Sequence, residues 1–344
     1  MDKLRVKKLQ AQIKNPVLIK KPVNLTYLIG RSFMHGYLLV KKNQVVFLGD
    51  GLEKAEGVAK TDFLKNVGKY IKPKETLGLS GEFTYNETEY IKFKNPKLKF
   101  KITVKHSPVD VERQVKDAGE LAKIKKSMEI VNAVFNLAKK QLKSKQWTER
   151  GLADFIQNTG LRLGAEDLSF PAIVAAGANA AVPHHVPGGK KLKPGESVII
   201  DFGFKYKKYC SDFTRTVFLK RTTKNLEMAY NQVEEAYLQS IVAARQGMQA
   251  GKLYDLAVSV LAQKKLEKYF IHSLGHGTGL EIHELPNLSP GSKDVLLPNM
   301  VFSVEPGVYL PKAGGIRIED LVYLTKHGAE KFINQPTKLS NNII

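Results

Sequence analysis

Short apolar runs separated by turn residues dominate the first third of the chain. Runs at 16–19, 25–29, 37–40 and 45–48 are bounded by residues such as glycine, proline and asparagine. Bounded runs of this length, rich in β-branched and aromatic residues, are typical of strands. Helical spacing is expected over residues 2–12 and 52–70, and the pattern as a whole predicts a small α/β layered domain over residues 1–108.

Longer helical periodicity follows Ser107-Pro108, where we expect a domain boundary. Apolar residues recur at helical spacing across 110–142 among lysines and glutamates. Thr148 is a suitable N-cap for a second helix that ends near Gly164. A strand-rich centre precedes two more expected helices, at 223–246 and 252–266. Residues 109–344 are therefore predicted to form a mixed α+β domain with antiparallel hairpins between its helices.

The composition predicts a globular chain that has no internal disulfide and no membrane span. Its 344 residues are 43% apolar, 25% charged and 9% aromatic, which is typical of a globular protein. The single cysteine, Cys210, cannot form an internal disulfide and is expected to be a small core residue. No run approaches the roughly 18 apolar residues of a membrane span, and the basic start leads into no apolar segment. We expect a cytoplasmic protein with no membrane partner.

The formal charge of +21 lies mainly in the first third of the chain. Residues 1–108 hold 22 Lys and Arg against 9 Asp and Glu, which leaves 32 against 24 for the rest. The lysines are scattered singly or in pairs, and no RNA-recognition or zinc-finger pattern is present. This distribution favours a solvated basic surface, so no specific nucleic-acid partner is expected.

Two predicted hairpins in the second domain each bring a pair of carboxylates together. Apolar segments flank a polar tip at 205–208, and a turn centred between residues 206 and 207 places Asp201 opposite Asp212. A second turn, centred on residue 312, places Glu305 opposite Glu319. Side chains opposite each other in an antiparallel pair lie about 5 Å apart, where like charges destabilise the sheet.

These carboxylate pairs predict a positive ion. A single acid is most often solvated at a strand end or paired with a lysine. Two matched pairs in one domain are different, because burying four unpaired carboxylates is prohibitive without raised pKa values or metal coordination.

A segment rich in histidine and glycine supplies a nitrogen ligand for such an ion. Three of the eight histidines, His272, His276 and His283, lie within twelve residues. The spacing of the first two would suit a helical metal pair, but the glycines between 275 and 279 disfavour a regular helix. Those glycines instead allow backbone or substrate to approach closely.

Together these residues resemble the creatinase, aminopeptidase P and prolidase branch of the M24 "pita-bread" metallopeptidases. The family's metal motifs are matched in order by Asp201-Phe202-Gly203, Ser211-Asp212-Phe213-Thr214-Arg215-Thr216, Gly275-His276-Gly277, Glu305-Pro306-Gly307 and Arg317-Ile318-Glu319-Asp320. Similarity covers residues 109 to about 330 and is looser over 1–108. The resemblance implies an α+β chain, with a small α/β creatinase-type N-terminal domain (1–108) followed by a pita-bread catalytic domain (109–344).

The resemblance also implies a dinuclear metal centre. Its ligands would be Asp201, Asp212, His276, Glu305 and Glu319, with Asp212 and Glu319 bridging two divalent ions. Family use suggests Mn²⁺ or Co²⁺, and Zn²⁺ and Fe²⁺ stay open. Such a centre would deliver a metal-bridging hydroxide to a peptide carbonyl while polarising that carbonyl.

Four further residues are expected at the catalytic site from their positions in the family's motifs. His184 and His283 match histidines that contact the substrate carbonyl and the tetrahedral intermediate. His272 matches a histidine that lines the site. Arg317 lies two residues before Glu319, on the same strand face, and is expected to orient a carboxylate or the substrate.

This branch implies cleavage of Xaa-Pro bonds in proline-containing peptides. An aminopeptidase removes the first residue from longer peptides with proline second, whereas a dipeptidase (prolidase) cleaves Xaa-Pro dipeptides and must recognise their carboxylate. Many prolidase-like relatives carry a basic residue directly after the His-Glu-Xaa-Pro stretch, where this chain has Asn287. That difference favours an Xaa-Pro aminopeptidase, with the dipeptidase as the alternative. The resemblance also suggests a homodimer.

Three other functions carry less weight. Methionine aminopeptidases generally lack an N-terminal domain of this kind. Some relatives have lost their metal ligands and serve as binding modules in chromatin or RNA assemblies, but such a module has no physical need for facing carboxylates. Creatinase-like amidinohydrolase chemistry needs no dinuclear metal, so the full set of ligands disfavours it too.

Overall fold

The computed structural model describes residues 2–30, 36–48, 67–72, 74–103 and 106–344. They belong to two compact units, Met1–Arg113 and Gln114–Ile344. The helix expected over 52–70 falls mostly outside the described residues, and only a 3₁₀ turn, η1 (Val67–Tyr70), is seen there.

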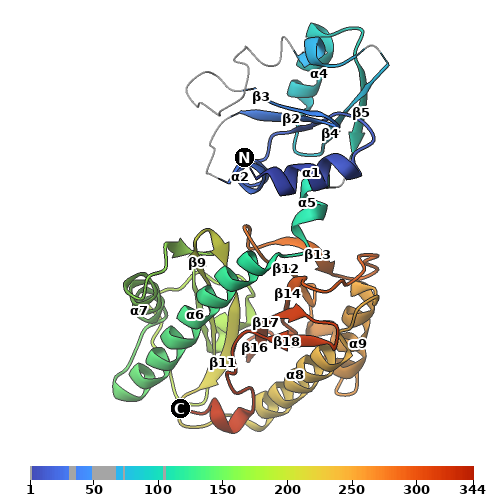
Figure 1. Ribbon diagram of the computed structural model, residues 1–344. Coiled ribbons are helices and arrows are strands. Elements are labelled where there is room, and N and C mark those ends of the chain that lie inside the picture. The colour runs from blue at the N-terminus through green and yellow to red at the C-terminus, as the bar shows by residue number, and fades with distance from the viewer. Residues whose placement is uncertain (1, 31–35, 49–66, 73, 104–105) are drawn as a thin grey trace. The chain divides into compact units, whose positions relative to one another are not determined.

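The first unit is a five-stranded sheet with helices packed around it (Figure 1). The strand order is β3-β2-β1-β4-β5, with β1 antiparallel to β2 and parallel to β4. Its elements are α1 (Lys3–Gln12), β1 (Val17–Ile19), α2 (Pro22–Ile29), β2 (Tyr37–Lys41), β3 (Gln44–Leu48), β4 (Thr76–Ser80), α4 (Tyr85–Lys94), β5 (Lys99–Thr103) and α5 (Pro108–Arg113). The predicted strands at 16–19, 37–40 and 45–48 and the helix at 2–12 are confirmed.

The strand expected at 25–29 is wrong, because these residues belong to helix α2. Pro22 occupies the first turn of this helix, where its missing N–H costs nothing. Gly30 ends it in the left-handed region, at φ 84°. An apolar run of five residues fits a buried helix as well as a strand, and these two flanking residues decide between them.

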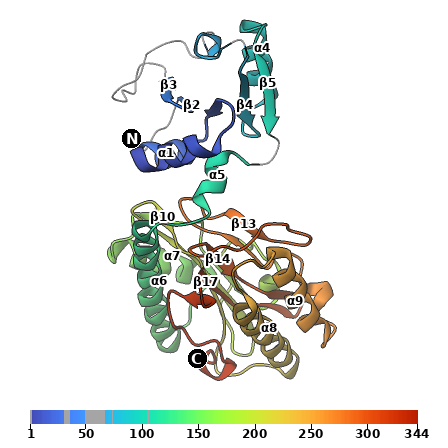
Figure 2. The same ribbon diagram turned by 45° about the vertical axis from the view of Figure 1, so that its right-hand side comes forward.

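The second unit is built around an eight-stranded antiparallel sheet (Figures 1 and 2). Its strand order is β13-β12-β14-β17-β11-β8-β7, with β18 also paired to β17. The strands of this sheet are β7 (Ile173–Ala176), β8 (Ser197–Asp201), β11 (Phe213–Phe218), β12 (Gly275–Gly277), β13 (Glu284–Leu288), β14 (Val301–Val304), β17 (Glu319–Leu324) and β18 (Ala329–Lys331). The smaller ladders use β6 (Asp167–Leu168), β9 (Phe204–Tyr206), β10 (Tyr209–Cys210), β15 (Gly307–Leu310) and β16 (Gly314–Arg317).

Helices cover both faces of this sheet. They are α6 (Ala118–Ser144), α7 (Glu149–Arg162), α8 (Lys224–Ala243) and α9 (Ala250–Ala262), with short 3₁₀ turns η2 (Gly177–Ala181), η3 (Glu267–Tyr269) and η4 (Leu339–Asn341). Val301 and Leu321 pack in the cluster that contains α6 and α7, whereas their neighbours Phe302 and Val322 pack in the cluster of α8 and α9. Successive strand residues point to opposite faces, so both faces of β14 and β17 are covered at these positions, each by one pair of helices.

The expected helices of this unit are confirmed, with one interruption. Thr148 caps α7 by accepting the N–H of Gly151, as predicted. The stretch 110–142, by contrast, divides into α5 and α6. Asp117 starts α6 with a capping box shared with Glu120, and Val115 forms an isolated bridge to Met300. Val115 pairs with Met300 and Asp117 caps the next helix, so the backbone of neither residue continues helix α5.

The register expected for the first hairpin is wrong, because the centre of the turn lies one residue further along the chain than predicted. Asp201 pairs with Thr214 rather than with Asp212. The turn centres on Lys207 and Lys208, which adopt φ values of 45° and 71°. This tight turn shifts the pairing by two residues and leaves Asp212 in the break between β10 and β11.

The register expected for the second hairpin is borne out on both sides of the acids. Gly307 pairs with Arg317 in the ladder of β15 and β16, and Val304 pairs with Asp320 in that of β14 and β17. Both ladders follow the predicted offset, and Glu305 and Glu319 lie in the step between them.

Close packing at Gly203 yields a test of this fold. A Cβ at Gly203 would collide with the backbone carbonyl of Ser211, which cannot move independently of the sheet. We expect Gly203→Ala to lower the free energy of unfolding by about 1–3 kcal/mol through overpacking. A matched control is Gly189→Ala, where nothing lies within 4 Å of the added Cβ; its effect should stay within about 0.5 kcal/mol. Urea denaturation measures both, and equal effects would contradict the prediction.

Candidate metal centre

A cavity of about 600 Å³ in the second unit gathers every residue predicted for the site. The nine predicted residues, all of which line the cavity, are His184, Asp201, Asp212, His272, His276, His283, Glu305, Arg317 and Glu319. They come from distant parts of the sequence and meet only in the folded sheet. Asn287 and Tyr309 also line this cavity.

The five expected ligands lie at the ends of strands or in breaks between them. Asp201 ends β8, Asp212 precedes β11, Glu305 follows β14 and Glu319 starts β17. His276 is the middle residue of the three-residue strand β12, with a register shift directly after it. Strand ends and bulges turn side chains toward a site without exposing the core.

Three of these residues come close enough to share one cation. Asp212, His276 and Glu319 each offer a ligand atom, and these atoms lie within 4.8 Å of one another. The Nε2 atom of His276 is 3.5 Å from Oδ2 of Asp212 and 3.3 Å from Oε1 of Glu305. Imidazole nitrogen and carboxylate oxygens at these distances are a suitable donor set for a divalent metal.

Burial and mutual repulsion set the protonation of the carboxylates. Burial raises the pKa of Asp212 well above its usual range, and the charges of Glu319 and Asp201 raise it further. Burial and the charges of Glu305 and Asp201 act in the same direction on the pKa of Glu319. Burial opposes ionisation of Glu305 too, but the hydrogen bond to His276 and the charges of His276, His272 and Arg317 together outweigh burial and lower the pKa to about 2.

This arrangement fits a divalent cation. Without one, Asp212 and Glu319 ionise only at high cost, since like charges in a buried site repel each other. Oδ1 of Asp201 is buried and has no hydrogen-bond partner among the residues that the structure describes. An unpaired, buried carboxylate oxygen facing other carboxylates is the donor that a positive ion satisfies.

Arg317 holds one of these carboxylates in place. Its Nη2 donates to Oδ2 of Asp201 at 2.5 Å, and its Nη1 donates to the hydroxyl of Tyr309 at 2.6 Å. The same hydroxyl lies 2.9 Å from Nε2 of His272. The predicted orienting contact of Arg317 is therefore with Asp201, and its side chain is buried where it lines the cavity.

The other two histidines lie at the cavity's outer edge. The ring of His283 meets that of His276 edge-on, with the centroids 4.2 Å apart. Burial lowers the pKa of His283, and the neighbouring His276 lowers it further. His184 is exposed. The loop that carries it is fixed by the buried Glu149, whose carboxylate lies 2.9 Å from His185 and accepts the N–H of Gly188 at 3.1 Å.

Comparison with known proteins identifies the family. The chain matches the metallopeptidase family M24 over residues 122–326. It belongs to this family. A protein of Pyrococcus furiosus named Xaa-Pro dipeptidase is 34% identical over 331 residues, which span 94% of each chain. The M24 fold expected from the sequence, with an N-terminal domain before a pita-bread catalytic domain, is therefore confirmed.

Solved structures agree with this membership over nearly the full chain. The prolidase of Pyrococcus horikoshii has a TM-score of 0.88 and 30% identity, covering 98% of this chain and 99% of that one. The X-Pro aminopeptidase of Thermotoga maritima has a TM-score of 0.81 and 29% identity, covering 96% and 99%. Among the described residues, no helix of this M24 chain has the length and apolar character needed to cross a membrane.

Three site residues were not foreseen from the sequence. Tyr309 links His272 to Arg317, Thr214 donates to Oε2 of Glu319 at 2.6 Å, and Ser303 donates to Oε1 of Glu305 at 3.1 Å. A signal for Tyr309 was present. The predicted register pairs residues 307 and 317, and the side chain two positions along a strand returns to the same face.

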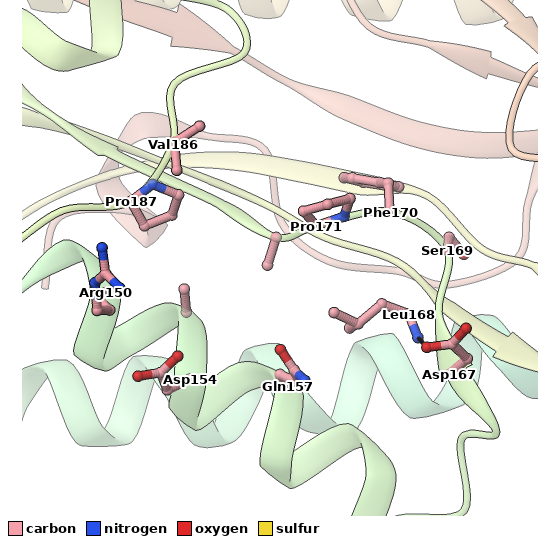
Figure 3. A pocket seen from close by; sticks show the side chains of 12 residues that line it. Arg150, Asp154, Gln157, Asp167, Leu168, Ser169, Phe170, Pro171, Val186 and Pro187 are labelled. Carbon is pink, nitrogen blue, oxygen red and sulfur yellow. Dashed lines mark hydrogen bonds between the residues drawn. The ribbon is translucent and has the colours of Figure 1, made fainter.

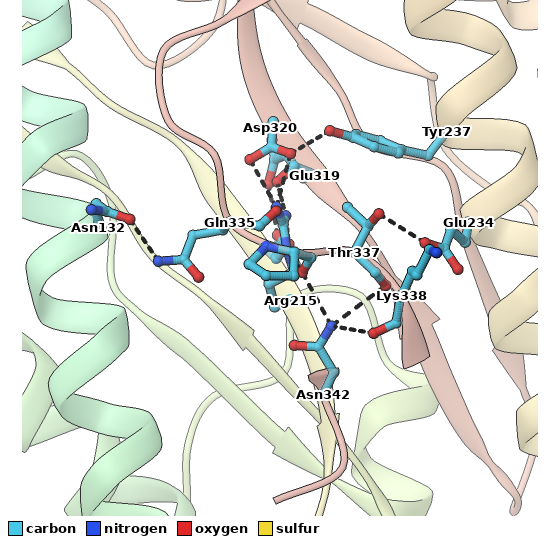
Figure 4. Close-up of polar contacts among 12 residues, drawn as sticks. Asn132, Arg215, Glu234, Tyr237, Glu319, Asp320, Gln335, Thr337, Lys338 and Asn342 are labelled. Atoms are coloured by element: carbon cyan, nitrogen blue, oxygen red, sulfur yellow. Dashed lines mark hydrogen bonds and ion pairs between the residues drawn. The ribbon is translucent and has the colours of Figure 1, made fainter. Parts of the chain in front are cut away.

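A buried ion pair supports the M24 site from behind (Figure 4). Nη2 of Arg215 donates to both carboxylate oxygens of Asp320, at 3.0 and 2.9 Å, and Nη1 donates to the backbone carbonyl of Glu319 at 2.6 Å. Tyr237 also donates its hydroxyl to Asp320. Arg215 and Asp320 are fully buried. These contacts fix the backbone from which Glu319 projects.

Removing one partner of this pair should destabilise the fold strongly. We expect Arg215→Met to lower the free energy of unfolding by about 3–5 kcal/mol, because it leaves the Asp320 charge buried and unpaired. The double variant Arg215→Met, Asp320→Leu should recover part of that loss. Arg221→Met, at an exposed arginine, is the control and should change little. Chemical denaturation compares the four proteins, and a single variant as stable as the control would refute the assignment.

Proposed function

We propose that this protein is a metal-dependent Xaa-Pro peptidase, which hydrolyses the bond between the first residue of a peptide and a proline in second position. The observation that carries this proposal is the convergence of five candidate ligands and three more histidines on one cavity of an M24 chain. Its relatives include proteins named for Xaa-Pro dipeptidase and X-Pro aminopeptidase activity.

Two divalent ions would be held by Asp201, Asp212, His276, Glu305 and Glu319, with manganese our first choice and cobalt the second. Bound there, they would polarise the scissile carbonyl and activate water for attack. The four carboxylates and one imidazole balance the charge of two such ions almost completely. This neutrality explains how so many acids are accommodated below the protein surface.

The protein's own residues would prepare the substrate. Arg317 orients Asp201 through its hydrogen bond at 2.5 Å, and its charge opposes the effect of burial, which raises the pKa of that carboxyl. His283 and His184, at the cavity's edge, are placed to donate a hydrogen bond to the carbonyl oxygen as charge develops on it. The lowered pKa of His272 keeps its ring neutral beside Tyr309, so this histidine acts as a positioning group.

The length of the substrate separates two versions of this activity. Several relatives are named Xaa-Pro dipeptidase or prolidase, and their similarity favours a dipeptidase activity for this chain. Asn287 favours the aminopeptidase, because it lines the cavity without the positive charge that a dipeptide carboxylate would need. The sequence alone favoured the aminopeptidase, whereas the relatives favour the dipeptidase.

Cleavage assays test the proposed activity directly. Protein stripped of metal and reloaded with manganese should release the first residue from Ala-Pro, from Ala-Pro-Ala or from both, and Ala-Ala-Ala should stay intact. Cleavage of the dipeptide alone assigns a prolidase, and a preference for the tripeptide assigns an aminopeptidase. A metal-loaded protein that cleaves neither proline peptide would exclude the proposed function.

Metal binding has its own readout. We expect about two manganese ions per chain by mass spectrometry after loading, and a rise in the thermal unfolding temperature, since a ligand that binds only the folded state stabilises it. Asp212→Asn should lose most of the bound metal and this thermal shift. Asp255→Asn, at an exposed position of α9 outside the cavity, is the control and should keep both. Full metal content in Asp212→Asn would contradict the ligand assignment.

A further inference from the structure

A second cleft, of about 550 Å³, opens beside the proposed peptidase site (Figure 3). Arg150, Asp154 and Gln157 project from helix α7 on one side. The opposite side is the segment 167–172, and Val186 and Pro187 close one end. These residues have no part in the chemistry argued above.

The two cavities share a wall. Phe170, Pro171 and Ala172, together with Val186 and Pro187, line both of them. Val186 is 78% exposed and forms an apolar rim between them. A chain held in the first cavity can therefore continue across this rim into the second.

Of the described residues that line this cleft, Arg150 alone carries a positive charge. Its backbone N–H donates to the carbonyl of Gly188 at 2.9 Å, which fixes the residue beside the Val186-Pro187 end of the cleft. Among the described residues, its guanidinium has no ion pair or side-chain hydrogen bond. Two carboxylates line the same cleft. Asp154 lies one helical turn from Arg150 on the same face of α7 but forms no ion pair with it, and Asp167 pairs with Lys205 at 3.6 Å.

We propose that this cleft binds the part of a peptide that follows the proline, and that Arg150 pairs with the peptide's C-terminal carboxylate. The inference rests on the proposed Xaa-Pro peptidase activity. The proposed activity gives the direction of the chain, because the bond after the first residue must lie at the candidate metal centre and the residues after the proline must leave the first cavity. Asn287 offers that carboxylate no charge in the first cavity, whereas an unpaired guanidinium in the second binds it with two parallel hydrogen bonds. The cleft thus selects substrates longer than a dipeptide.

The test is a series of Ala-Pro peptides from two to six residues, each made with a free C-terminal acid and with an amide. Wild-type protein, Arg150→Gln and Arg162→Gln are loaded with manganese, and release of the first residue gives kcat and KM. Arg162 lies on the same helix and is exposed, but it does not line the cleft, so it is the matched control.

For free-acid peptides of the length that reaches Arg150, we expect Arg150→Gln to raise KM about five-fold with kcat unchanged, as for an exposed charge pair. Amidation should raise the wild-type KM by the same factor and leave the variant unaffected. KM for the dipeptide, and every value for Arg162→Gln, should match the wild type.

Other outcomes overturn the inference in distinguishable ways. Arg150→Gln matching the wild type on all free-acid peptides, or showing the same defect on the dipeptide and the amides, would exclude the carboxylate contact while Xaa-Pro cleavage stands. Wild-type cleavage of dipeptides alone would exclude peptide binding in the cleft and leave a prolidase. Failure to cleave any of the proline peptides would remove the proposed function, and the inference with it.

Discussion

Burial of four carboxylates around one cavity is the constraint on which the second unit depends. Burial raises the pKa of both Asp212 and Glu319, and repulsion from neighbouring carboxylates raises it further. Such a cluster is stable only if positive charge is brought to it. His276 lies beside Glu305 and Arg317 pairs with Asp201, so these two side chains supply part of the positive charge. The remaining carboxylate oxygens are suitable ligands for divalent ions.

The sheet makes this concentration of charge possible without breaking its own core. The acids lie at strand ends and breaks, where side chains leave the regular alternation, and the interiors of the same strands remain apolar and are covered by helices on both faces. Behind the site, the paired charges of Arg215 and Asp320 fix the start of β17. The scaffold is rigid where the ligands are anchored, as a preorganised site requires.

The region around the site gives the family chemistry its individual character. Two cavities meet at the rim formed by Val186 and Pro187. One holds the candidate metal ligands, and the other holds Arg150, whose guanidinium forms no ion pair with the described residues. A peptide that reaches from the first cavity to Arg150 would have to be extended across this rim. Asn287 and Arg150 together would then decide substrate length, while the buried acids decide the reaction.

The sequence by itself determined the second unit's helices, the offset of the second hairpin and the nine residues of the candidate site, because periodicity and ordered motifs are local signals. It misjudged residues 25–29 and the first hairpin, where Pro22, Gly30 and the tight turn at Lys207-Lys208 outweigh the apolar pattern. Only the tertiary structure buried Arg215 against Asp320 and set Arg150 beside the cavity. Those contacts join residues far apart in the sequence, and their geometry depends on how strands and helices pack, which no local pattern encodes.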